Sequence, residues 1–133
     1  MLMLAGLMRG LVVGLALVLT WLGMGQAAFA QTYQIKMGAD NGMLAFQPAQ
    51  LTIQVGDTVE WLNNKLPPHN VIFSAVPNGD KELAAKLSRQ ALVYKVGDSF
   101  RITFNGDLPT GTYTYYCTPH RGAGMQGKIV VQG

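Results

Sequence analysis

The chain has 133 residues, and its ten Lys and Arg side chains outnumber its seven Asp and Glu side chains only slightly, for a formal net charge of +3. These charges are scattered, so we exclude nucleic-acid binding, which needs a concentrated basic surface. A single cysteine excludes an internal disulfide bond.

The first 30 residues have the composition of an export signal. Arg9 is their only charged residue, an apolar run extends from residue 11 to residue 24, and an Ala-Phe-Ala cleavage pattern ends at residue 30. The apolar run is short for a membrane span, which needs about 20 residues. We therefore expect residues 1–30 to be a cleaved signal peptide, with an uncleaved anchor as the alternative, and residues 31–133 to be one domain.

The remaining hundred or so residues suit a single domain with one core, and their pattern predicts an all-β fold. Short runs with strand-like composition are separated by turn signals such as Gly56-Asp57 and Gly97-Asp98. We expect about eight strands, at residues 33–36, 51–54, 58–62, 71–75, 91–95, 100–104, 112–116 and 128–131. Strands at this spacing are typical of an antiparallel β-sandwich.

One segment departs from the β pattern. In residues 81–87, Glu82 and Lys86 stand four positions apart, where they support each other on a helix, so we expect a short helix in a crossover connection. Trp61, Ile102 and Phe104 are most simply core residues.

The residues with metal-binding chemistry form a characteristic set. Cys117, His120 and Met125 lie in one short stretch, YCTPHRGAGM at residues 116–125, and His69 is the only other histidine. A thiolate, two imidazoles and a thioether are the ligands of a blue-copper electron-transfer site. Cys117, His120 and Met125 are close enough for one loop to surround a single ion, whereas His69 must come from a neighbouring strand. We therefore predict one copper ion per chain.

Other interpretations of these residues are weaker. A lone cysteine is usually an inert buried thiol and a lone methionine is usually core filler, but here both occur with two histidines. A structural zinc site prefers four strong donors. A cysteine hydrolase using Cys117 and His120 would lack an oxyanion-hole signature, and a copper oxidase or nitrite reductase needs further histidines. We therefore expect an electron carrier rather than an enzyme.

Three stretches resemble the plastocyanin family, and the likeness covers the chain from about residue 32 onward. They are GTYTYYCTPHRGAGMQGK at residues 111–128, PHNVIF at 68–73 and GADNGMLAF at 38–46. The resemblance implies a Greek-key sandwich with copper at one end, and a soluble one-electron carrier. The Cys-x-x-His-x-x-x-x-Met spacing is shared with other small cupredoxins, so the alternative is an amicyanin-like carrier in a periplasmic respiratory chain.

The resemblance also implies partners and a location. The donor would be cytochrome f and the acceptor photosystem I, with a terminal oxidase left open as a further acceptor. Docking to these membrane complexes would be transient, and the carrier is expected to be a monomer. Together with the export signal, the resemblance implies a cyanobacterial precursor and a mature protein in the thylakoid lumen, with the periplasm as the less favoured location.

By resemblance, Asn70 ties the His69 strand to the Cys117 loop, and its backbone amide donates to the Cys117 sulfur. Its alternative role is that of an ordinary turn residue. Such contacts around a metal ligand hold the ligand and adjust the reduction potential.

We expect a docking surface for redox partners in the loops that flank the predicted ligands. Leu44, Leu66 and Pro68 are apolar and lie in those loops, so we expect them to form part of a docking patch. The resemblance implies that this patch surrounds the edge of His120 and that electrons leave through His120. Arg121 would guide docking. By resemblance, Tyr116 belongs to a second surface linked to copper through Cys117, and its alternative is ordinary strand packing. Residues 74–95 mix acidic and basic side chains, so the acidic patch of plant-type plastocyanins is not expected here.

Overall fold

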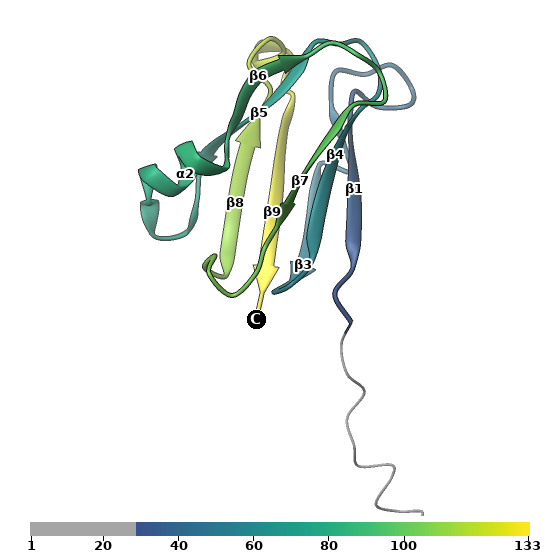
Figure 1. The fold of residues 1–133 in the computed structure, drawn as a ribbon. Helices are drawn as coiled ribbons and strands as arrows, with labels where there is room; N and C mark the ends of the chain where they lie inside the picture. The colour runs from purple at the N-terminus through teal and green to yellow at the C-terminus, as the bar shows by residue number, and fades with distance from the viewer. Residues whose placement is uncertain (1–28) are drawn as a thin grey trace, which may run out of the picture.

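Two β-sheets packed face to face make up the part of the chain that the computed structural model describes, residues 29–133. Their strand orders are β2-β1-β4-β7 and β3-β9-β8-β5-β6 (Figure 1). The strands are β1 Thr32–Met37, β2 Phe46–Gln47, β3 Gln50–Gln54, β4 Thr58–Asn63, β5 His69–Ala75, β6 Arg89–Val93, β7 Ser99–Thr103, β8 Gly111–Tyr116 and β9 Gln126–Gln132. The helical segments are η1 Pro77–Gly79, α2 Lys81–Leu87 and η2 Arg121–Ala123.

Residues 1–28 of the predicted signal peptide lie outside the described residues. Within residues 29–133, none of the helices has the length and apolar character that a membrane crossing requires.

The predicted sandwich is confirmed, but its sheets are mixed rather than wholly antiparallel. β1 pairs with β4 in parallel, and β3 pairs with β9 in parallel. Turn signals report hairpins between consecutive strands, whereas these two pairs join strands that are distant along the chain. The sequence therefore carried no local sign of them.

Two strands differ from the sequence-based expectation. β2 is only two residues long and was not predicted. The strand expected at residues 91–95 forms at Arg89–Val93, because Arg89 pairs with Val71 and Val93 pairs with His69. The bounds of this edge strand are therefore decided by β5, its partner.

An aromatic cluster fills the space between the sheets. Trp61 is fully buried, with the Phe100 ring stacked on it at 5.3 Å and the Tyr115 ring meeting it edge-on at 5.6 Å. Phe73 also packs edge-on against Trp61. Such pairs add to the stabilisation from burial of apolar area. The predicted core residues Trp61, Ile102 and Phe104 are all buried.

The predicted helix is confirmed as α2. Its N-cap is Asp80, whose side chain accepts a hydrogen bond from the Leu83 amide at 3.1 Å. At its other end, the Ser88 hydroxyl donates to the Ala84 carbonyl and accepts from the Phe73 amide of β5. These bonds dock the crossover onto the sheet.

The loops that join β1 to β2, β4 to β5 and β8 to β9 gather at one end of the sandwich, and the C-terminus lies at the other end (Figure 1). We call the first end the loop end. It brings together the upstream histidine and the downstream cysteine loop.

Candidate metal centre

The upstream histidine is the first residue of β5. His69 is fully buried, and its Nε2 lies 2.5 Å from the backbone oxygen of Lys65. A carbonyl oxygen only accepts hydrogen bonds, so Nε2 carries the ring hydrogen and the lone pair of the neutral ring is on Nδ1. That lone pair is available to a metal. The role of the Lys65 carbonyl was not predicted, because a backbone group leaves no signal in the sequence.

The other three predicted ligands come from the loop between β8 and β9. The Cys117 amide donates to the Met125 carbonyl at 3.1 Å, and the Met125 amide donates to the His120 carbonyl at 3.3 Å. The turn at η2 ends on Gly124, whose φ of +86° is a backbone region that glycine adopts readily. These bonds close the loop on itself. Cys117 and Met125 are fully buried, whereas His120 is half-buried.

The side chains of His69, Cys117 and His120 converge on one point. Nδ1 of His69 lies 3.7 Å from Cys117 Sγ, and Nδ1 of His120 lies 3.6 Å from the same sulfur. The three candidate ligand atoms all lie within 4.8 Å of one another. Within residues 29–133, this is the only group of at least three His, Cys, Asp or Glu side chains close enough to hold a metal ion.

Burial shapes the protonation of this site. Burial is the largest cause that raises the pKa of the Cys117 thiol, and hydrogen bonds from the backbone amides of Asn70 and His120 act in the opposite direction. Burial also lowers the pKa of His69, with the Lys65 carbonyl opposing it and His120 adding to it. Without a metal, burial therefore favours the protonated thiol of Cys117 and the neutral ring of His69. The two backbone amides favour the thiolate form of Cys117.

These residues fit copper. The three converging donors are two imidazole nitrogens and one sulfur, and the loop that carries Cys117 also holds a buried methionine. This donor set matches a blue-copper centre rather than a structural zinc site with four strong donors.

Asn70 joins the two segments that carry these donors. Its Oδ1 accepts from the Thr118 amide at 2.7 Å, and its Nδ2 donates to the Thr118 hydroxyl at 3.1 Å and to the Gln90 carbonyl at 3.2 Å. The turn-residue interpretation does not describe these bonds, because Thr118 is 48 residues away along the chain.

Leu44, Pro68 and Arg121 lie in loops of the loop end and Tyr116 is the last residue of β8, and two of these predicted docking residues are in contact. The Arg121 guanidinium lies over the Tyr116 ring, 4.0 Å from its centre, a cation–π contact. Arg121 is exposed and Tyr116 is half-buried.

Apolar side chains are also accessible in these loops. Leu44 and Pro68 are half-buried, whereas Met43 and Leu66 are exposed. Leu66 was expected in the docking patch together with Leu44 and Pro68, and Met43 adds an apolar side chain to the same loops; Leu66 adopts a positive φ of 51°, which is uncommon for a side chain of this size.

Comparison with known proteins now decides the family. Residues 33–132 match the family described as copper binding proteins, plastocyanin/azurin family. The chain belongs to this family. A plastocyanin from Nostoc punctiforme is 54% identical over 109 residues, which cover 80% of this chain and 78% of that protein. A plastocyanin from a Synechococcus species is 57% identical over 106 residues, covering 80% of this chain and 77% of the relative.

A solved structure supports the same conclusion. A mutant fern plastocyanin superposes with a TM-score of 0.63 at 30% identity, covering 75% of this chain and 100% of the fern chain. A mutant amicyanin, in the reduced state, superposes with a TM-score of 0.55 at 30% identity, covering 76% of this chain and 82% of that one. The fold is that of this family, and the curated relatives named above favour a plastocyanin-like carrier over the amicyanin-like alternative.

The chain is thus a copper-binding, blue-copper electron carrier and not an enzyme. A carrier of this kind acts between redox partners.

Proposed function

We propose that His69, Cys117, His120 and Met125 hold one copper ion per chain. The observation that carries this proposal is the convergence of two Nδ1 atoms on the Cys117 sulfur, at 3.7 and 3.6 Å. When bound, copper supplies a centre that takes up and returns one electron.

The protein's contribution is a rigid cage. His69 is oriented through Nε2 by a backbone carbonyl, and Cys117 lies in a loop that its own amides close. Groups held in this way move little when the charge at their centre changes, which favours rapid electron exchange. His120 is the exposed edge of the set, so a partner approaches the centre most closely there.

We propose that the carrier takes electrons from cytochrome f and delivers them to photosystem I in the thylakoid lumen. The names of the cyanobacterial relatives and the export-signal composition of residues 1–30 support this proposal. A terminal oxidase is the alternative acceptor. The accessible apolar side chains of the loop end, with Arg121 beside them, suit brief docking to such membrane complexes.

Visible absorption of the purified protein after addition of Cu(II) tests the metal site. We expect an intense blue band that bleaches with ascorbate and is absent in Cys117→Ser, because the band arises from the thiolate bonded to copper. Zinc-loaded protein is the colourless control. A folded protein that stays colourless with Cu(II) would reject the copper-carrier proposal.

Laser-flash kinetics test the partner. We expect Arg121→Glu to slow electron transfer to photosystem I roughly tenfold at low salt, because charge complementarity raises encounter rates. Lys128→Glu, on β9, is the control with the same charge change. Fast transfer to a terminal oxidase with none to photosystem I would instead favour the respiratory alternative.

A further inference from the structure

The backbone carbonyl that orients His69 belongs to an exposed residue, and its place in the fold depends on neighbouring groups. Lys65 lies in the loop between β4 and β5, four residues before His69, and its side chain is exposed. If its carbonyl turned away, Nε2 would lose its acceptor inside a buried site. This carbonyl therefore fixes the ring hydrogen on Nε2 and leaves the lone pair on Nδ1, the nitrogen that faces Cys117.

The end of β1 supports this loop through backbone contacts. The amides of Asn64 and Lys65 both donate to the Met37 carbonyl, at 3.0 and 3.2 Å. Gly38 lies so close to Lys65 that a Cβ atom at Gly38 would stand 2.0 Å from the Lys65 oxygen. Two loops are thus in direct backbone contact behind the acceptor of His69.

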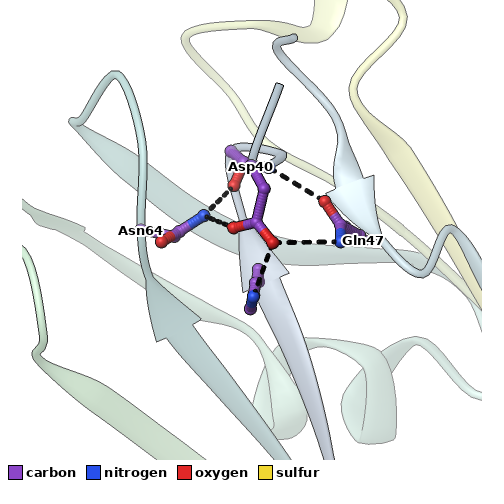
Figure 2. Close-up of polar contacts among 5 residues, drawn as sticks. Asp40, Gln47 and Asn64 are labelled. Atoms are coloured by element: carbon purple, nitrogen blue, oxygen red, sulfur yellow. Dashed lines mark hydrogen bonds and ion pairs between the residues drawn. The ribbon is translucent and has the colours of Figure 1, made fainter. Parts of the chain in front are cut away.

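A side-chain network holds the same two loops together. The side-chain amide nitrogen of Asn64, Nδ2, donates to the Gly38 carbonyl at 2.8 Å and to Asp40 Oδ1 at 3.0 Å. The other carboxylate oxygen, Asp40 Oδ2, accepts from Lys36 Nζ at 2.7 Å and from Gln47 Nε2 at 3.4 Å. The backbone amide of Asp40 donates to Gln47 Oε1 at 2.9 Å. Figure 2 shows Asn64 and Gln47 approaching Asp40 from opposite sides.

We propose that Asn64 and Asp40 are positioning residues for His69. Asn64 uses both of its amide hydrogens to fasten the β4–β5 loop to the β1–β2 loop, and Asp40 holds the Asn64 amide in place. Together they keep the Lys65 carbonyl on Nε2 and so keep the Nδ1 lone pair of His69 directed at the site. This role rests on the proposed function of His69 as a copper ligand.

The same sheet offers a matched control. Glu60, on β4, accepts from Gln34 at 2.9 Å and from Arg101 at 2.8 Å. Like Asp40, it therefore holds an amide and a cation. Its partners lie on the neighbouring strands β1 and β7 rather than in the loop that carries Lys65.

The first experiment measures the His69 ring by NMR in the copper-free protein. In Asn64→Ala we expect the Nε2 hydrogen of His69 to exchange with water roughly threefold to tenfold faster, the effect of losing about one hydrogen bond. Asp40→Ala should give a smaller increase in the same direction. Glu60→Ala should leave the exchange rate at its original value.

The second experiment measures the reduction potential of the copper-loaded protein. A hydrogen bond from Nε2 to a carbonyl raises the basicity of the ligand nitrogen and so favours Cu(II). We therefore expect Asn64→Ala and Asp40→Ala to raise the potential, with no shift in Glu60→Ala. Asp40→Asn keeps an oxygen that can accept from Asn64, and it should restore most of the original potential.

Unchanged exchange and unchanged potential in a folded Asn64→Ala protein would overturn the proposal. So would equal changes in Glu60→Ala, because they would mean a general loosening of the sheet. If Asn64→Ala fails to fold, Asp40→Ala has the same two readouts and decides the question in the same way. Failure of the original protein to bind copper would reject the proposed function instead, and the copper-free measurement would still test the positioning role.

Discussion

The two segments that supply the candidate ligands are built in opposite ways. The loop between β8 and β9 carries Cys117, His120 and Met125 and closes on itself through its own amides. The start of β5 supplies only His69, and contacts with the end of β1 and the β1–β2 loop hold the residues that precede it. A local loop can be recognised from its spacing. A ligand oriented by a neighbouring loop, such as His69, depends on residues such as Asn64 and Asp40. These residues do not bind the metal, so the sequence does not single them out.

The contact between Gly38 and Lys65 offers the strongest way to break this arrangement. In Gly38→Ala, the new Cβ would lie 2.0 Å from the Lys65 oxygen, and φ is +86°. We expect the free energy of unfolding to fall by about 3 kcal/mol, in the range of steric mutations at special backbone positions. Chemical denaturation measures the change.

Gly42→Ala separates the clash from the backbone strain. Gly42 has a similar φ of +83°, but nothing lies within 4 Å of a Cβ placed there. It should cost only about 1 kcal/mol, the cost of a left-handed conformation for a non-glycine residue. Equal losses in the two variants would show that contact with Lys65 is unimportant for stability.

Loss of the Asn70 hydrogen bonds that connect the start of β5 to the β8–β9 loop should give the next largest decrease in stability. Asn70→Ala removes the acceptor of the Thr118 amide and the donor to Gln90, and Asn70 is buried. We expect a loss of about 2 kcal/mol, because the hydrogen bonds to the Thr118 amide and the Gln90 carbonyl are lost together. The thermal or chemical unfolding midpoint measures it.

Thr118→Ala is the matched control for Asn70→Ala. It removes only the hydroxyl that accepts from Asn70 and leaves the backbone bond from the Thr118 amide in place. Its cost should be about 1 kcal/mol or less. A larger loss in Thr118→Ala than in Asn70→Ala would contradict the view that the Asn70 side chain connects the two segments.

The smallest expected effect is the pH dependence of the stability that Asp40 gains from its hydrogen bonds with Lys36 and Asn64. The hydrogen bond from Lys36, and next the one from Asn64, lowers the pKa of Asp40 below its ordinary value of 3.8. The folded state therefore favours the carboxylate more than the unfolded chain does. This stabilisation is present above the unfolded pKa and is lost as the pH falls from about 4 through the lower folded pKa.

Comparison of the original protein with Asp40→Asn isolates this contribution. The difference between their unfolding midpoints should be constant near pH 7 and should shrink below about pH 4. Because Asp40 is exposed, salt should weaken the difference. A difference that stays constant down to pH 3 would show that Asp40 gains nothing from its partners.

Much of the fold could be predicted because its signals are local. The predicted helix forms at the expected residues, and Trp61 and Phe104 lie in the core as expected. The parallel pairs β1–β4 and β3–β9 were missed, because no local turn connects their strands. β6 was placed two residues late, because its register depends on β5.

The site shows the same division. The chemistry of the candidate ligands can be read from the sequence, because Cys117, His120 and Met125 have a spacing that one loop can satisfy and His69 is the only other histidine. The orientation of His69, the contact of Arg121 with Tyr116, and the support of the Lys65 loop by Asn64 and Asp40 all depend on the folded arrangement of distant segments. The physical reason is that donor chemistry belongs to a side chain. The direction of a lone pair depends on backbone carbonyls and loop contacts that exist only once distant strands have paired.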